Sequence, residues 1–174
     1  MQKAMQDGSD RRYFHGVRVY QDVVVAGQTI CDGRRDCADR WTILDPHLPP
    51  AGTFLDIGSN IGWFGQKLCE TRPQVVVASV EADERLAAAQ RAVLEANRSQ
   101  RICLLTARAG KALAQAFAAE GQRFDAVLCL SVLHWIVDHR AMMQELGRIS
   151  RRLLIEHPDF REAGAGIEAI RQDI

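Results

Sequence analysis

A glycine-punctuated turn between a predicted strand and a predicted helix constrains the fold of this chain most. The short run over residues 53–57 is apolar apart from Thr53 and Asp56, as expected for a buried strand. Gly58 and Gly62 follow, and an amphipathic helix is expected to start around Asn60. Because glycine lacks a Cβ, Gly58 can adopt a left-handed backbone and Gly62 can let a ligand approach closely. Together with the unpaired N–H groups of the helix start, this turn predicts a site for a nucleotide-like ligand.

The spacing of the two glycines argues against a dinucleotide phosphate site. Such a site requires the pattern G-x-G-x-x-G, whereas its third and sixth positions here are Asn60 and Trp63. Asp56 inside the strand end would also repel a pyrophosphate, and it favours a ligand that carries a cation. Adenosine with a charged amino-acid tail meets these requirements, and a nicotinamide dehydrogenase is disfavoured.

Three segments resemble motifs of the class I S-adenosylmethionine-dependent methyltransferases. Residues 56–62, with the pattern Asp-x-Gly-x-x-x-Gly, look like motif I of that family. Glu81, at the end of the apolar run 75–80, stands 25 positions after Asp56, where the family has a ribose-binding acid. Residues 124–135 are similar to the fourth-strand motif. The resemblance covers roughly residues 50 to 160.

The resemblance implies an α/β fold, Rossmann-like and doubly wound, with a mainly parallel sheet in a three-layer α/β/α arrangement. The alternation of short β-branched runs with longer helical patterns independently favours this architecture. After the fifth strand only a helix is predicted, near residues 160–174, so either the sheet lacks the family's last two strands or the sequence is part of a longer chain. The five strands are expected near residues 53–58, 75–81, 101–106, 125–131 and 151–156.

Two units are expected, an N-terminal hairpin and cover segment over residues 1–50 and an S-adenosylmethionine-binding methyltransferase domain over residues 51–174. Residues 17–25 and 29–30 flank a short turn and predict a β-hairpin, and a short helix is expected over residues 41–48. The cover either closes the ligand site at the carboxyl edge of the sheet or decorates the surface without touching the ligand. An open sheet edge could be covered by a helix, by the hairpin or by a second copy in a homodimer.

Charge and composition argue against several classes of partner. Basic and acidic residues balance at 22 each, so there is no basic face for nucleic acid or anionic lipid. No run approaches the ~20 apolar residues that a membrane span needs, and the first eight residues lack a signal-peptide core. We therefore expect a cytoplasmic protein. The five cysteines are expected to be buried, reduced thiols, and zinc binding by Cys31 and Cys37 is disfavoured by their spacing, so no metal is expected.

The resemblance places the cofactor at the strand ends. Asp56 is expected to face the methionine ammonium group, and Glu81 to accept both ribose hydroxyls. Read from the residues alone, Asp56 could instead be a turn acid that binds backbone N–H groups, and Glu81 a solvent-facing acid. Asn60 is expected to cap the helix or to touch the ligand. The remaining cofactor-binding candidates are Gly58, Gly62, Ala82, Ser131, Arg40 and Tyr20.

Two of these candidates depend on how the cover segment folds. If it lies over the site, Arg40 and Tyr20 could meet the cofactor carboxylate, because a guanidinium binds a carboxylate in a bidentate manner. The alternative for Arg40 is a solvated charge. At the third strand the chain departs from the family, which usually supplies an acid near the adenine amine. Residues 104–108 offer Thr106 or backbone groups instead.

His134 is the catalytic candidate. Methyl transfer from a sulfonium depends mainly on positioning, but an oxygen or nitrogen nucleophile benefits from a base, for which histidine has a suitable pKa. His134 follows the predicted fourth strand, which should deliver it to the site. The alternative is that His134 packs beside Trp135 or caps the next helix.

The expected function is methyl transfer from S-adenosylmethionine to an oxygen or nitrogen of a small molecule or glycan. Base methylation is disfavoured, because the chain lacks Asn-Pro-Pro-Tyr and Pro-Cys signatures. Residues 127–136, with Tyr20-Gln21 and the segment 35–41, are similar to methylphosphate-capping enzymes and to uncharacterised bacterial methyltransferases, with Arg34 and Arg35 as candidate anion contacts. A non-catalytic binding module or regulatory subunit is the alternative, motivated by the short sheet and the missing adenine-side acid.

Overall fold

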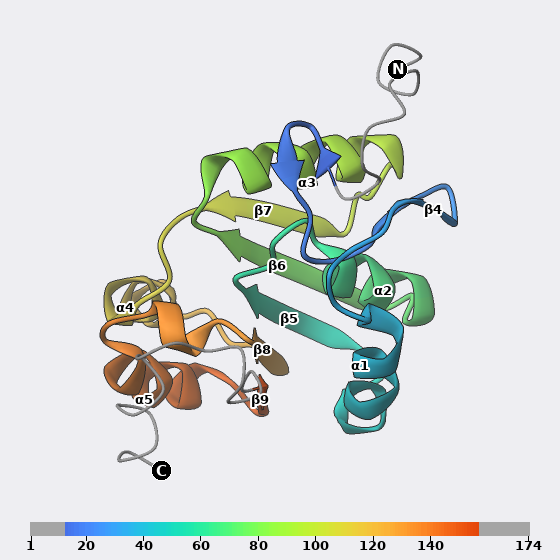
Figure 1. Ribbon diagram of the computed structural model, residues 1–174. Helices are drawn as coiled ribbons and strands as arrows, with labels where there is room; N and C mark the ends of the chain where they lie inside the picture. Colours follow the sequence, from blue (N-terminus) through green and yellow to red (C-terminus); the bar gives the residue numbers. More distant parts are fainter. Residues whose placement is uncertain (1–12, 157–174) are drawn as a thin grey trace.

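Five parallel strands form the central sheet of the computed structural model, which describes residues 13–156. The sheet order is β7-β6-β5-β8-β9, so the first of these strands in the chain lies at the centre (Figure 1). This topology confirms the Rossmann-like three-layer fold, and each strand lies within two residues of its expected range at either end. The helix expected near residues 160–174 lies outside the described residues. The strands are β5 (Gly52–Ile57), β6 (Val75–Glu81), β7 (Ile102–Thr106), β8 (Ala126–Leu130) and β9 (Leu153–Glu156).

Helices cover both faces of the sheet. Because side chains alternate along a strand, Leu55 and Ile57 of β5 point to one face and Phe54 points to the other. Leu55 and Ile57 join a core cluster with residues of α4 and α5, whereas Phe54 packs with residues of α1 and α2. Asp56 shares its side of the strand with Phe54 and so faces α1 and α2. The helices are α1 (Cys37–Leu44), α2 (Trp63–Thr71), α3 (Glu84–Ala96), α4 (Lys111–Ala119) and α5 (His139–Ile149).

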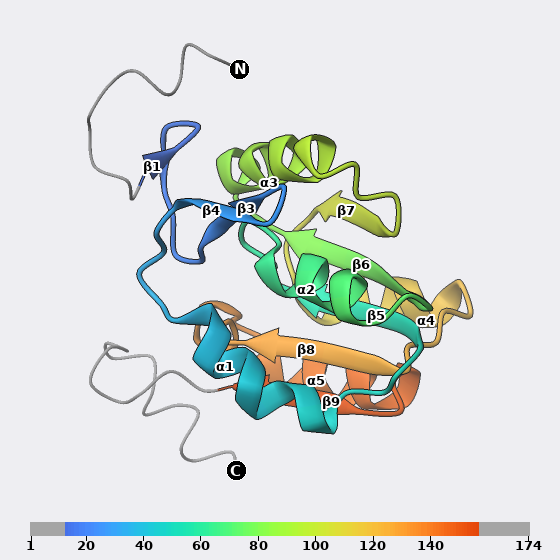
Figure 2. The same ribbon diagram turned by 90° about the vertical axis from the view of Figure 1, so that its right-hand side faces the viewer.

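The N-terminal segment forms two small hairpins before α1. They are β1 (Tyr13–Phe14) with β2 (Val17–Arg18), and β3 (Val23–Val25) with β4 (Gln28–Cys31). Figure 2 shows β3, β4 and the start of α1 on the side toward which the strand arrows point. The expectation of one continuous strand over residues 17–25 is wrong, because residues 19–22 leave the extended path to contact other segments. The Tyr20 carbonyl accepts the Arg35 N–H (3.1 Å), and the Gln21 side chain reaches Trp63.

Two helices begin elsewhere than expected. The helix predicted over residues 41–48 starts at Cys37, because the Asp36 side chain accepts the Asp39 N–H and caps it, and it ends in a 3-10 turn over Asp45–His47. Helix α2 starts at Trp63 rather than near Asn60. The backbone of Asn60 is left-handed (φ 57°), which interrupts the helical path.

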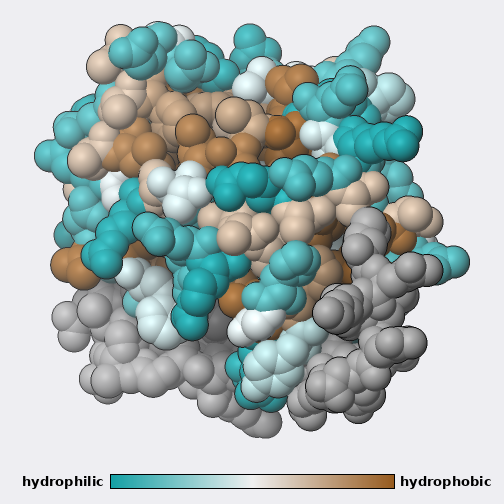
Figure 3. All heavy atoms as spheres, turned by 90° about the horizontal axis from the view of Figure 1, so that it is seen from above, coloured by the Kyte–Doolittle hydropathy of each residue, from teal (hydrophilic) through white to brown (hydrophobic). Residues whose placement is uncertain are grey.

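Helix α3 begins at Glu84, directly after a capping acid. Asp83 is its N-cap, and its side chain accepts the backbone N–H groups of Arg85 and Leu86. Seen from the α3 side, the described surface carries hydrophilic side chains around a patch of hydrophobic atoms (Figure 3). None of the helices in residues 13–156 is long and apolar enough to cross a membrane.

All five cysteines are free thiols. Cys31, Cys37 and Cys129 are buried, in line with the expectation, and Cys69 is partly buried. Cys103 is exposed, because β7 is the edge strand of the sheet and this side chain points away from the core.

Candidate functional site

Two carboxylates meet at the carboxyl edge of the sheet. Asp56 lies next to the end of β5 and is 2% exposed, and Glu81 ends β6 and is 8% exposed. Burial, helped by the nearby Glu81 charge and opposed by Arg40, raises the pKa of Asp56 to about 7. The structure thus brings together the two acids singled out from the sequence. A carboxylate that is buried this deeply is stabilised in its charged form by a cationic partner.

Glu81 ties the end of β6 to the glycine turn. Its Oε1 accepts the N–H groups of Ala82 (2.8 Å) and Asp83 (2.9 Å), and its Oε2 accepts the N–H of Asn60 (2.8 Å). Since a carboxylate offers about four lone-pair positions, one acceptor position remains, on Oε2. Glu81 is therefore not a solvent-facing loop acid, whereas the Ala82 side chain is exposed.

The two glycines of the turn are required by close contacts within the protein. Gly58 has a φ of 72°, and its N–H and that of Ser59 both donate to the Val80 carbonyl (2.8 and 3.0 Å). Gly62 has a φ of 81°, and a Cβ there would lie 2.5 Å from Nε2 of Gln90. The left-handed Gly58 agrees with the prediction. Gly62 makes room for the buried Gln90 side chain, and its expected role in ligand approach stays a prediction.

Asn60 does not cap α2, so that part of its prediction is wrong. Gly62 occupies the N-cap position, and the Trp63 N–H donates to the side-chain Oε1 of Gln21 (3.0 Å). The Asn60 Oδ1 is buried without a hydrogen-bond partner among the described residues. The sequence analysis named Gln21, which is 4% exposed, only within the Tyr20-Gln21 resemblance and gave it no role in the site. A further signal in the sequence is that Gln21 is a polar side chain within the mostly apolar run 17–25.

Arg40 lies at the same edge, in contact with the end of β9. Its Nε donates to both carboxylate oxygens of Glu156 (3.0 and 2.9 Å), and its Nη2 also pairs with this carboxylate. The guanidinium lies 4.8 Å from the centre of the Phe64 ring. Its side chain is 12% exposed, so Arg40 is not the solvated charge of the alternative interpretation. Its Nη1 is buried and has no hydrogen-bond partner in the described part of the chain.

Tyr20 is engaged within the cover segment. Its hydroxyl accepts the Nε–H of Arg35 (2.8 Å), and the Arg35 guanidinium lies 5.8 Å from the centre of its ring. No contact of the described structure joins Tyr20 to Asp56 or Glu81. The expected role of Tyr20 at the cofactor carboxylate therefore stays a prediction.

Four buried polar atoms of this edge lack a hydrogen-bond partner within residues 13–156. Leaving a buried polar group unpaired costs about 1–3 kcal/mol, so such atoms gather where a ligand completes them. Here they include both carboxylate and amide acceptors and a guanidinium donor. The acceptors suit an ammonium group and the guanidinium donor suits a carboxylate, so together they fit a ligand that carries both. The atoms are Asp56 Oδ2, Arg40 Nη1, Asn60 Oδ1 and Ser131 Oγ.

The loop after β8 carries the remaining candidates. Ser131 is left-handed (φ 54°), and its N–H donates to the Glu156 carbonyl (2.9 Å). A short 3-10 turn, Leu133–Trp135, follows. The His134 ring lies 4.9 Å from the Trp135 ring, tilted by 45°, so His134 does pack beside Trp135. This contact leaves a catalytic role for His134 as a prediction.

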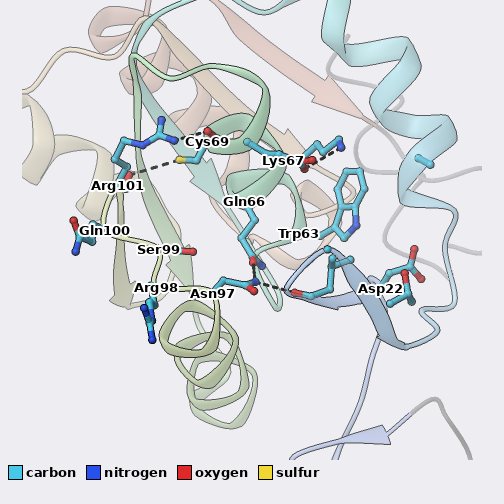
Figure 4. A pocket seen from close by; sticks show the side chains of 15 residues that line it. Asp22, Trp63, Gln66, Lys67, Cys69, Asn97, Arg98, Ser99, Gln100 and Arg101 are labelled. Atoms are coloured by element: carbon cyan, nitrogen blue, oxygen red, sulfur yellow. Dashed lines mark hydrogen bonds and ion pairs between the residues drawn. The ribbon is translucent and has the colours of Figure 1, made fainter.

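A cavity of about 800 Å³ lies apart from this edge, between the β3–β4 hairpin, α2 and the loop from α3 to β7 (Figure 4). Asn97 bridges its walls, donating to the Val24 carbonyl (2.8 Å) and accepting the Ala26 N–H (2.9 Å). None of the candidate residues lines the cavity. We place the site at the strand ends because the buried acids and unpaired polar atoms gather there.

The fold and this edge define a class I methyltransferase domain. The chain belongs to the methyltransferase domain family, whose model matches residues 55–154. This membership confirms the class of S-adenosylmethionine-dependent methyltransferases and S-adenosylmethionine as the cofactor. No curated protein sequence matches the chain.

Solved structures agree with the fold. The N-terminal domain of EvdMO1 in the presence of SAH and D-fucose is 22% identical with a TM-score of 0.64, over 79% of this chain and 57% of that one. WbdD, described as a bifunctional kinase-methyltransferase, is 19% identical with a TM-score of 0.66, over 78% and 32%. The StiE O-MT fragment is 16% identical with a TM-score of 0.55, over 67% and 41%. The chain thus spans little more than half of the EvdMO1 domain, and at these identities the likeness shows the fold alone.

Proposed function

We propose that this chain transfers a methyl group from S-adenosylmethionine to an oxygen or nitrogen of a small molecule or glycan. The observation that carries the proposal is the pair of buried acids, Asp56 and Glu81, beside the unpaired Nη1 of Arg40. The cofactor supplies a methyl group on a sulfonium: the acceptor lone pair forms the new bond to carbon, and the carbon–sulfur electron pair returns to sulfur as a neutral thioether. The acceptor proton is released.

The ends of the amino-acid part would be held by groups of opposite charge. Asp56 Oδ2 provides an acceptor for an ammonium group, and ion pairing would offset the burial that raises the pKa of this acid to about 7. Arg40 Nη1 provides a donor for a carboxylate while Nε and Nη2 stay bound to Glu156. Asn60 Oδ1 and Ser131 Oγ are further candidates for polar contacts with the ligand.

Glu81 is the proposed ribose-binding residue, with a limit set by its present bonds. Its free acceptor position on Oε2 can take one ribose hydroxyl. Accepting both hydroxyls requires the Asn60 N–H to leave Oε2. We therefore propose that the glycine turn shifts at Asn60 when the ribose binds, and that Gly58, Gly62 and Ala82 contribute backbone surface to this site.

His134 is proposed to take the proton from the acceptor. An imidazole is a suitable base near neutral pH, and His134 is partly buried in the loop after β8, the strand that pairs with the Asp56 strand β5. The cover, residues 1–50, is proposed to close the site through Gln21 and Arg40, and residues 51–174 to form the methyltransferase domain. Tyr20 is retained as a second contact for the cofactor carboxylate.

The acceptor class is supported by the solved structures that share the fold. One EvdMO1 domain was crystallised with D-fucose, and the StiE fragment is named an O-methyltransferase. Both favour an oxygen acceptor on a small molecule or sugar.

Calorimetry with S-adenosylhomocysteine tests the proposed cofactor site. We expect the wild-type chain to bind and both Asp56→Asn and Glu81→Gln to bind at least about tenfold more weakly, which corresponds to about 1.4 kcal/mol. Glu84→Gln is the matched control, because Glu84 is exposed three residues further on. Circular dichroism establishes that each variant is folded. Wild-type protein that does not bind would refute the proposal.

Transfer of a labelled methyl group separates an enzyme from a binding module. The wild-type chain, supplied with labelled S-adenosylmethionine and a cell extract, should label an extract component, and His134→Ala should do so more slowly with unchanged S-adenosylhomocysteine affinity. Binding without transfer to any component would favour the non-catalytic alternative, which the exposed Thr106 in place of an adenine-side acid also favours.

A further inference from the structure

The loop between β8 and α5 displays two large apolar side chains to solvent. Trp135 is 79% exposed and Val137 is fully exposed. Burying such surface against a partner is favourable, and exposed apolar groups of this size mark contact sites when they lie together at a functional edge. The other two tryptophans of the chain, Trp41 and Trp63, are both only 9% exposed.

The loop holds these side chains outward on a fixed backbone. Leu133 and Ile136, which alternate with the exposed residues, are each 7% exposed and belong to the core cluster of α4 and α5. The N–H groups of Trp135 and Ile136 each donate to the carbonyl three residues earlier, those of Val132 and Leu133, both at 3.0 Å. The exposure of Trp135 is therefore a property of an anchored turn rather than of a loose one.

This anchored turn also touches the proposed cofactor site. Val132 packs so closely on Gly58 that a Cβ at Gly58 would lie 2.5 Å from its Cγ2. Trp135 follows three residues later, and its ring lies 4.9 Å from that of His134. The exposed indole is therefore carried by a turn that begins in contact with the glycine turn of the proposed cofactor site.

The composition of the loop indicates which kind of ligand it could bind. The loop, residues 131–138, contains no lysine and no arginine, and the carboxylate of its one acid, Asp138, accepts the Lys111 N–H (2.9 Å). An uncharged aromatic surface suits a ligand with an apolar face and polar edges, because the indole offers its face for packing while the neighbouring imidazole can meet a hydroxyl. A phosphate or a nucleic acid would call for basic groups that this loop lacks.

We propose that Trp135 is an acceptor-contacting residue that packs against the apolar face of an uncharged pyranose ring and directs one of its hydroxyls toward His134. The inference rests on the proposed methyltransferase function and names its acceptor class. Val137 extends the same surface. In this proposal the loop after β8 determines which acceptor is bound, whereas Asp56 and Glu81 hold the cofactor.

Tryptophan fluorescence of the full chain tests this inference, because Trp135 is the one highly exposed tryptophan of the three. The protein is saturated with S-adenosylhomocysteine and titrated with D-fucose and a panel of methyl glycopyranosides, with acrylamide quenching as the readout. We expect at least one sugar to reduce quenching at least twofold. Trp135→Ala should abolish this protection and weaken sugar binding in calorimetry at least tenfold, whereas Trp135→Phe should retain part of it.

The controls separate this inference from the proposed function. Val76→Ala removes another exposed apolar side chain, 46% exposed at the opposite end of β6, and should leave sugar binding unchanged. Failure of the wild type to bind S-adenosylhomocysteine would refute the proposed function itself. Binding of S-adenosylhomocysteine without protection by any sugar would refute the proposed sugar contact of Trp135 and leave the proposed function standing. Protection that instead rises with protein concentration, with a dimer in size-exclusion chromatography, overturns the sugar contact in favour of an interface between copies.

Discussion

Gly58 and Val132 are in contact across the ends of β5 and β8, and a Cβ on Gly58 would lie 2.5 Å from the Val132 Cγ2 atom. The glycine belongs to the turn that the sequence assigns to the cofactor, and the valine belongs to the loop that carries His134 and Trp135. This packing joins the two halves of the proposed site, so a change in the position of one segment must be accommodated by the other.

Gly58→Ala should destabilise the chain by about 2–4 kcal/mol, because it adds both a clash and the strain of a β-carbon at a φ of 72°. Urea unfolding measures this change. Gly121→Ala is the matched control, since Gly121 has a φ of 68° and open space around it, and it should cost only about 1–2 kcal/mol. If the clash matters, Val132→Ala should recover part of the loss in the double variant. Equal costs for the two glycines would contradict the packing argument.

The arrangement of the sheet could be predicted from the sequence, whereas the contacts that close the site could not. Strands and the helix capped by Asp83 follow from local periodicity and capping, which a single segment carries. The pairs Gln21–Trp63 and Arg40–Glu156 join positions 42 and 116 residues apart, and no local pattern encodes such a pairing. Gly62 was recognised as special, but its partner Gln90 belongs to another helix, so the reason for the glycine appears only in three dimensions.

Ionisation of Asp56 should make the free protein less stable as the pH rises. Its pKa is raised from 3.8 to about 7, so between these values the folded chain binds more protons than the unfolded chain and stability falls with increasing pH. The loss is on the order of 4 kcal/mol at most, since one pKa unit corresponds to about 1.4 kcal/mol. Urea unfolding from about pH 4 to pH 8 should show this decline in the wild type and a flatter profile in Asp56→Asn. Parallel profiles would show that Asp56 titrates normally.

Removing the side-chain acceptor of Gln21 should loosen the cover from α2. Gln21→Ala leaves the buried Trp63 N–H without its partner, which should cost about 1–2 kcal/mol in unfolding free energy. Gln28→Ala is the control, because Gln28 is exposed on the tip of the β3–β4 hairpin. Thermal unfolding compares the two. Similar melting temperatures for both variants would indicate that the N-terminal segment is held by its apolar contacts alone.

Substitution of Arg40 should weaken cofactor binding more than substitution of Glu156, although the two side chains form an ion pair. Glu156→Gln keeps the Nη1 donor of Arg40 and should reduce S-adenosylhomocysteine affinity by less than about threefold, or about 0.6 kcal/mol. Arg40→Lys loses the planar guanidinium that can bind Glu156 and a second carboxylate together, and should reduce the affinity at least about tenfold. Arg85→Lys, at a side chain 79% exposed, is the control in the same calorimetry. Equal losses in Arg40→Lys and Glu156→Gln would mean that the ion pair only supports the fold, and that the cofactor carboxylate is bound elsewhere.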